Sequence, residues 1–173
     1  GDEGKGKFVD LFARAADLVV RFQGGPHTGH TVVTDRGTTK FVQVPAGVAQ
    51  GVPNVIAGGC VVDPVALVDE IAALEAAGWE VDLKIADTAH VIFPYHRAQD
   101  IAMEAWRGGR WAVSAADGLR DGTGQLGSTK SGVGPCREDK VARIGLRMGD
   151  LLDAELLRAR LTRLVALKRR QVA

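Results

Sequence analysis

Residues 1–7 read GDEGKGK, a glycine-rich stretch that fits the pattern G-x-x-x-x-G-K. Glycines at these positions let backbone N–H groups curl around phosphate oxygens, and a helix that opens directly after them adds its positive end. Lys5 and Lys7 add two full positive charges. The stretch therefore predicts a phosphate-binding loop that resembles a P-loop. The alternative is a glycine-rich turn that holds no ligand.

The residue after Lys7 is Phe8, where a P-loop usually has the Ser or Thr that holds magnesium. Either no metal binds here or another residue supplies the ligand. Asp2, inside the loop, is the candidate for that ligand.

Alternating elements follow this loop. A helix is predicted at 6–16 and strands at 18–22, from Thr31, at 41–44 and at 54–57. Asp63 caps a helix that begins at Pro64 and ends at Gly78. A strand at 90–93, a helix at 96–107 and a last helix after Asp153 complete the order, and residues 107–128 are expected to be the least ordered.

The order of these elements predicts an α/β fold with a largely parallel sheet and flanking helices. The apolar sides of the first two helices are expected at Val9, Leu11, Phe12 and Ala16, and at Leu67, Val68, Ile71 and Leu74. Phosphate loops follow a strand, and no strand precedes residue 1. We therefore expect a fragment of a larger domain that lacks its first strand.

The composition excludes several classes of protein. With 173 residues and a formal net charge of +1, the chain has no bulk positive field for nucleic acid, so any anion site must be local. Cys60 and Cys136 form neither a disulfide framework nor a zinc site. No apolar stretch is long enough for a membrane span, and no signal peptide opens the chain. We expect a soluble, cytoplasmic protein.

Two further stretches have residues suited to chemistry. Residues 23–31, QGGPHTGHT, follow a strand, where open α/β sheets place their ligands. His30 can donate a proton or a hydrogen bond near neutral pH, and Gly29 lets its carbonyl approach an ion. The alternative for His30 is a structural histidine.

Residues 127–135, GSTKSGVGP, are followed by EDKVAR at 138–143. Hydroxyl groups among glycines suit a phosphate or a ribose, and Arg143 can contact a phosphate with two hydrogen bonds. The alternative is a flexible surface loop followed by a charged helix start.

GDEGKGK, QGG-x-x-x-GHT, [ST]T-x-x-G-x-GP and EDKVAR, in this order, resemble the adenylosuccinate synthetase family. Residues 45–47 (PAG), 58–64 (GGCVVDP) and 94–96 (PYH) resemble it too. The similarity runs over nearly the whole chain but covers only the first part of the family's length.

The resemblance implies a GTP-dependent ligase that joins IMP to L-aspartate in two steps. A base takes the proton from N1 of IMP and O6 attacks the γ-phosphate of GTP, after which the amine of aspartate displaces phosphate. It implies that Asp2 is the base and a Mg²⁺ ligand, His30 the acid, and the Gly29 carbonyl a second Mg²⁺ ligand. The implied GTP contacts are Gly1, Asp2, Glu3, Gly4, Lys5, Gly6, Lys7, Gly29, His30 and Thr31.

The implied IMP contacts are Asp2, Glu3, Gly4, Lys5, His27, Thr28, Gly29, His30, Thr129 and Arg143. Arg143 is implied to reach the IMP phosphate of the partner subunit in a homodimer. The family's guanine- and aspartate-binding residues lie outside this chain, so we expect the isolated chain to be inactive.

This chain departs from the family pattern at two places. His27 stands where the family's His-Asn-Ala has its asparagine, and TTGRGIGP is here STKSGVGP at 128–135. An arginine is lost, and Lys130 is the residue that we expect to compensate. One alternative is a relative that converts dGMP to 2-aminoadenylosuccinate, although such enzymes replace the loop aspartate and Asp2 is retained. The other is a non-catalytic nucleotide-binding fragment.

Overall fold

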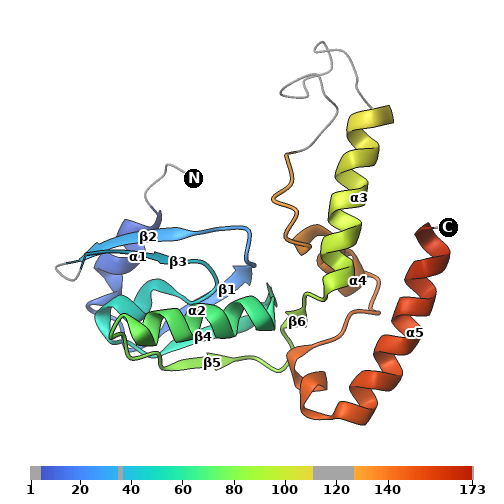
Figure 1. The fold of residues 1–173 in the computed structure, drawn as a ribbon. Coiled ribbons are helices and arrows are strands. Elements are labelled where there is room, and N and C mark those ends of the chain that lie inside the picture. Colours follow the sequence, from blue (N-terminus) through green and yellow to red (C-terminus); the bar gives the residue numbers. More distant parts are fainter. Residues whose placement is uncertain (1–4, 35–36, 111–126, 173) are drawn as a thin grey trace. The chain divides into compact units, whose positions relative to one another are not determined.

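The computed structural model describes residues 5–34, 37–110 and 127–172 (Figure 1). The chain divides into two compact units. The sheet unit comprises Gly1–Val91 and Leu146–Ala173, and the helical unit comprises Ile92–Gly145. Each unit is described by itself.

The sheet unit is built on a parallel sheet in the order β1 (Val19–Gly24), β4 (Asn54–Val62), β5 (Leu83–Ile85). A short strand, β6 (His90–Val91), pairs in parallel with the end of β4. The register of β1 on β4 shifts between Arg21 and Gln23. A Cβ atom at Gly59 would lie 2.1 Å from the Phe22 carbonyl oxygen, so only glycine fits beside this irregularity. The predicted parallel sheet is confirmed.

A second, two-stranded sheet lies in the same unit. β2 (His30–Thr34) and β3 (Gly37–Phe41) pair antiparallel, with His30 opposite Phe41 and Thr31 opposite Lys40. Pairing with β3 holds the N-terminal end of β2 in place, because the first two residues of the strand are both paired. That end contains the predicted site residues His30 and Thr31.

Among the described residues, α-helices and short 3-10 helices complete the sheet unit. They are α1 (Lys5–Ala13), η1 (Ala46–Gln50), α2 (Pro64–Ala76), η3 (Met148–Leu152) and α5 (Ala154–Val172). The predicted cap of α2 is confirmed, since Asp63 Oδ1 accepts a hydrogen bond from Ala66 N at 3.1 Å. Gly78, just past the helix, has the positive φ that favours glycine. Asp153 likewise caps α5 by accepting from Leu156 N at 2.9 Å.

The hydrophobic core of the sheet unit joins the hairpin, the parallel sheet and α2. Its buried members are Val32, Phe41, Val44, Ala46, Val48, Ile56, Cys60, Val62, Leu67, Leu74, Trp79 and Ala89. Figure 1 shows α2 lying along the strands β4 and β5. No helix among the described residues is long and apolar enough to cross a membrane.

The helical unit contains α3 (Pro94–Arg110) and α4 (Val133–Val141), which pack against each other. His96 is fully buried and links the two helices, because its Nε2 lies 3.1 Å from Asp139 Oδ2. His96 Nδ1 accepts a hydrogen bond from Phe93 N, so the proton of a neutral ring lies on Nε2, which donates to Asp139. The Tyr95 hydroxyl also donates to Asp139 Oδ2, at 3.1 Å.

Some predicted elements were wrong. Residues 42–44 are not a strand, because β3 ends at Phe41 and the backbone N–H groups that follow bind a carboxylate from α2. The first helix ends at Ala13, and 92–93 precede α3 rather than continue β6. The α3 helix runs to Arg110, past the predicted start of the loop region, and most of that region (111–126) lies outside the described residues.

The apolar stripe predicted on the first helix was wrong, because Val9, Leu11 and Phe12 are exposed and Ala16 lies beyond the end of α1. On α2, Leu67 and Leu74 are buried as predicted, but Val68 is exposed. In the helical unit, the alternative of a charged helix start at EDKVAR is wrong, because α4 begins at Val133 and ends at Val141.

Candidate functional site

The N-terminal end of α1 lies against the start of β2. A Cβ atom placed on Gly6 would lie 3.4 Å from His30 Cβ and 3.5 Å from the Thr31 carbonyl oxygen. The structure therefore brings Lys5 and Lys7, next to Gly6, close to the strand that begins with His30. The predicted residues Gly1, Asp2, Glu3 and Gly4 lie outside the described residues.

His30 lies half-buried among positive charges. Burial lowers the pKa of His30 below its ordinary value, and the charges of Arg21 and Lys5 lower that pKa further. A lowered pKa keeps the imidazole neutral at neutral pH, where it can donate one N–H hydrogen bond. The local field is positive and therefore suits an anionic ligand.

Arg21, which the sequence analysis did not single out, holds the loop before His30. Its Nη2 donates to the Gly25 carbonyl oxygen at 2.8 Å and to Thr28 Oγ1 at 2.9 Å. The Thr28 hydroxyl in turn donates to the Gly25 carbonyl oxygen at 3.4 Å. The sequence signal for this role is a lone charged residue within the apolar stretch 18–22.

The same guanidinium group also holds the segment 42–44. Arg21 Nη1 donates to the carbonyl oxygens of Val42 and Gln43. From the other side, the carboxylate of Glu70 on α2 accepts from Val42 N at 2.6 Å, Gln43 N at 2.7 Å and Val44 N at 3.2 Å. Arg21 therefore binds carbonyl oxygens of this backbone segment, and Glu70 binds its N–H groups. Arg21 also joins the segment to the loop at 25–28.

Lys40 is a further positive charge that the sequence analysis missed. It lies opposite Thr31 in the hairpin, and a Cβ atom on Gly29 would lie 3.0 Å from Lys40 Cε. Gly29 itself is exposed, as are His27 and Thr28. The predicted residues 27–31 thus form a continuous surface segment beside the cations of α1 and β3.

One predicted metal ligand lies among the described residues. Gly29 is exposed and has no side chain to cover its carbonyl oxygen, which is the kind of donor that Mg²⁺ prefers. Within residues 5–34, 37–110 and 127–172, no group of three or more His, Cys, Asp or Glu is arranged to hold a metal. The predicted second ligand, Asp2, lies outside the described residues.

The other predicted IMP contacts, Thr129 and Arg143, belong to the helical unit. Thr129 is exposed on the segment before α4, and its Oγ1 lies 2.7 Å from Ser131 Oγ. Arg143 is exposed just after α4, and its N–H donates to the Lys140 carbonyl oxygen at 3.1 Å.

Lys130 and Arg143 are the non-glycine residues with positive φ in the described part of the chain, at 56° and 60°. Residues other than glycine and asparagine seldom adopt this left-handed backbone conformation. It is strained in other residues and often marks a functional position. Arg143 occupies the position after a helix end where glycine is usual. Both residues lie in segments that are predicted to bind substrate.

Comparisons with known proteins point to one family. The adenylosuccinate synthetase family model matches residues 1–173. The adenylosuccinate synthetase of Halobacterium salinarum is 45% identical over 169 residues, which cover 98% of this chain and 36% of that protein. That of Heliobacterium modesticaldum is also 45% identical, over 97% of this chain and 36% of the relative.

Two solved structures share the fold. The fully ligated adenylosuccinate synthetase of Plasmodium falciparum has a TM-score of 0.78 and 31% identity, over 96% of this chain and 36% of that one. The succinoaminodeoxyadenylate synthetase of cyanophage S-2L, bound to dGMP and dATP, has a TM-score of 0.62 and 27% identity, over 90% of this chain and 40% of that one. The chain spans about a third of the length of the relatives that it matches. By the match of the family model along its whole length, this chain belongs to the adenylosuccinate synthetase family.

Proposed function

We propose that this chain is the N-terminal part of a single GTP- and IMP-binding domain in a ligase that forms adenylosuccinate from IMP and L-aspartate. The reaction consumes GTP and releases GDP and phosphate. The observation that carries the proposal is the contact of Gly6 at the start of α1 with His30 and Thr31 on β2. It joins a helix N-terminus, lysines and a histidine in one place, in a chain of this family.

Residues 1–7 and 29–31 bind the phosphates of GTP in this proposal. The start of α1 directs the positive end of the helix toward an anion, and Lys5 and Lys7 offer full positive charge. Lys40 beside Gly29 adds to the same field. Phosphoryl transfer depends chiefly on such positioning and charge, because little covalent chemistry is left for the protein.

The reaction then proceeds in two steps. Asp2 takes the proton from N1 of IMP, and O6 attacks the γ-phosphate of GTP to give 6-phosphoryl-IMP and GDP. His30 donates its N–H to the transferring phosphoryl group, whose negative charge it stabilises. The amine of aspartate then attacks C6 and displaces phosphate.

Asp2 and the Gly29 carbonyl would hold the Mg²⁺ ion in this proposal. A bound ion would supply positive charge to the phosphate oxygens. An aspartate in the loop takes the place of the P-loop hydroxyl residue that Phe8 replaces. The exposed Gly29 backbone supports the second ligand.

The proposed IMP contacts include His27, Thr28 and Thr129. Arg143 contacts the IMP phosphate of a partner subunit, so the active enzyme is a homodimer. The exposure of Arg143 leaves its side chain available to a ligand, and its left-handed backbone is typical of functional residues.

The test is product formation by the full-length protein. Purified protein is incubated with GTP, aspartate and either IMP or dGMP, and products are separated and identified by mass. We expect adenylosuccinate from IMP and no product when GTP or aspartate is omitted. The 173-residue chain alone serves as a control that should form none.

If the full-length protein prefers dGMP to IMP, its function is instead the formation of 2-aminoadenylosuccinate. The likeness to the cyanophage structure bound to dGMP is the observation that favours this alternative. Equal amounts of IMP and dGMP in one reaction decide between the two functions, because the product masses differ. No product from either nucleotide would contradict both.

A further inference from the structure

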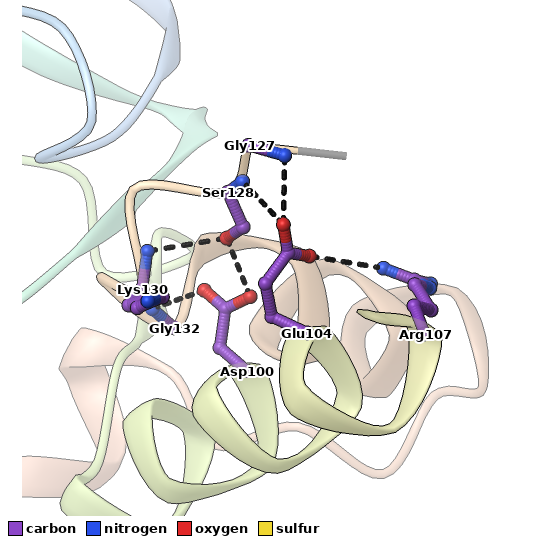
Figure 2. Close-up of polar contacts among 7 residues, drawn as sticks. All are labelled: Asp100, Glu104, Arg107, Gly127, Ser128, Lys130 and Gly132. Carbon is purple, nitrogen blue, oxygen red and sulfur yellow. Dashed lines mark hydrogen bonds and ion pairs between the residues drawn. The ribbon is translucent and has the colours of Figure 1, made fainter. Parts of the chain in front are cut away.

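The segment 127–132, which we call the substrate loop, is held from one side by two carboxylates of α3 (Figure 2). Glu104 Oε1 accepts hydrogen bonds from Gly127 N at 2.7 Å and from Ser128 N at 3.2 Å. Asp100 Oδ1 accepts from Ser128 Oγ at 2.6 Å, and Asp100 Oδ2 accepts from Gly132 N at 2.9 Å. The two acids therefore fix both ends of the loop.

Both carboxylates are buried, which is unfavourable in itself. The exposed fractions of Asp100 and Glu104 are 8% and 2%, and the residues lie one turn apart on the same face of α3. Burial of a charged group destabilises the fold unless hydrogen bonds or an opposite charge compensate. Arg107 Nη1 lies 3.9 Å from Glu104 Oε2, and N–H and O–H groups of the loop donate hydrogen bonds to both carboxylates. Apolar side chains would pack here without that penalty but would not fix the loop.

The fixed ends leave the middle of the loop exposed. Thr129 and Lys130 are both exposed between the anchored residues. Ser128 Oγ donates to Asp100 and accepts from Lys130 N at 3.1 Å. The left-handed backbone of Lys130 is thus supported by Asp100 through the hydroxyl of Ser128.

The last residue of the loop is pressed against the start of α3. Gly132 has a φ of 79°, and a Cβ atom there would lie 2.9 Å from Arg97 N and 3.0 Å from His96 Cβ. Together with the Asp100 bond, this close approach packs the loop end against α3. Contacts that need no ligand thus hold the two ends of the loop on either side of Thr129 and Lys130.

We propose that Asp100 and Glu104 are positioning residues that pre-form the substrate loop for the nucleoside monophosphate. This inference rests on the proposed function, in which Thr129 contacts IMP. Folding orders the loop in advance, so binding does not have to restrict its backbone. Without the anchors, that ordering would oppose IMP binding and leave GTP binding, which we place on the sheet unit, unchanged.

The test is steady-state kinetics of the full-length enzyme. Ser128→Ala removes the hydroxyl that joins Asp100 to Lys130, and we expect KM for IMP to rise about fivefold, the size of one missing hydrogen bond. Asp100→Ala should raise it further. KM for GTP should stay within about twofold in both variants, because the change weakens the binding of IMP only. Ile101→Ala, on an exposed position of the same helix, is the matched control and should leave both constants unchanged.

Conservative variants separate positioning from a general loss of structure. Glu104→Gln keeps an oxygen that accepts from Gly127 N and Ser128 N, and Asp100→Asn keeps one acceptor for Gly132 N while its amide donates to Ser128 Oγ. Both should retain a KM for IMP near that of the parent, whereas Glu104→Ala and Asp100→Ala should not. An equal rise in KM for both substrates, with a lower Tm, would overturn the inference.

Thr129→Val distinguishes failure of this inference from failure of the proposed function. If Thr129→Val raises KM for IMP while Ser128→Ala and Asp100→Ala leave it unchanged, the positioning role is wrong and the IMP contact stands. If Thr129→Val has no effect, the proposed contact and the inference that rests on it both fail. If Asp100→Ala does not fold, Ser128→Ala alone decides between these outcomes.

Discussion

Arg21 Nη2 donates a hydrogen bond to Thr28 Oγ1 across 2.9 Å, so a residue in the middle of β1 fixes the loop that leads to His30. The same guanidinium group donates to carbonyl oxygens of Gly25, Val42 and Gln43. A planar fork with several donors makes these contacts at once, and a lysine ammonium on a flexible stem does not.

Arg21→Lys should therefore destabilise the sheet unit although the charge is kept. We expect a loss of about 1–3 kcal/mol in the free energy of unfolding, from hydrogen bonds to a charged donor. Urea unfolding of the purified chain measures it. Arg14→Lys, at an exposed residue just past α1, is the matched control. A loss as small as the roughly 0.5 kcal/mol typical of surface changes would show that the Arg21 contacts are not important for stability.

Asp2 and His30 should control turnover in the full-length enzyme. Asp2→Asn keeps the shape but loses basicity and charge, so kcat should fall by at least about 10²-fold. His30→Asn should also lower kcat, with little effect on KM for aspartate, because its partner is the transferring phosphoryl group. Steady-state kinetics on folded, dimeric variants measures both. A kcat within a few-fold of the parent for Asp2→Asn would contradict the mechanism.

Arg143→Gly should stabilise the protein while it removes function. Glycine relieves the left-handed backbone at φ 60°, and after its greater loss of chain entropy we expect a net gain of about 0.5–1 kcal/mol. Thermal unfolding measures the gain. Val141→Gly, at the exposed last residue of α4, relieves no such strain and should instead destabilise, by up to about 0.5 kcal/mol. Loss of stability in both variants would show that residue 143 is not strained.

Mixed dimers should test whether Arg143 acts on a partner's site. Subunits with Arg143→Leu and subunits with Asp2→Asn are each expected to be inactive in homodimers. Mixing them should restore part of the activity, because one site of each hybrid would contain both intact residues. No restoration under conditions where subunits exchange would contradict a shared site.

Cys136 should resist alkylation in the folded chain. Burial, followed by the charge of Asp139, raises the pKa of Cys136 to about 12. The thiolate is the reactive form, so at pH 8 the thiol should react far more slowly than in urea-unfolded chain. Because the folded pKa lies above the unfolded one, this thiol also favours the folded state at pH values below about 9, and that contribution is lost as the pH rises toward about 12. Labelling with iodoacetamide, followed by mass spectrometry, measures the rate of alkylation. Rapid modification of Cys136 in the folded chain would contradict the expected protection.

The elements predicted correctly are those whose signals are local. Asp63 and Pro64 specify the start of α2 through neighbouring residues, and the same holds for Asp153 at α5. The strand expected at 41–44 failed because Glu70, far along the chain, takes the N–H groups that a strand would need. No local pattern contains such a contact.

The candidate site shows the same contrast between local signals and contacts with distant residues. Lys5 and Lys7 lie close to His30, as expected for loops that follow a strand and open a helix. Arg21, Asp100 and Glu104 were missed because charged side chains on a strand or helix usually face solvent. Their roles depend on which distant loop covers them, and only the tertiary structure determines that.

The anchored ends of the substrate loop have a consequence for how this family can diverge. The hydroxyl at 128 and the glycine at 132 make the contacts with α3, and this chain keeps both where the family pattern has TTGRGIGP. Its departures at Lys130 and Ser131 lie between those anchors. Mutation can therefore exchange the charge offered to a substrate without losing the loop conformation, so new nucleotide preferences are open to selection at little risk to folding.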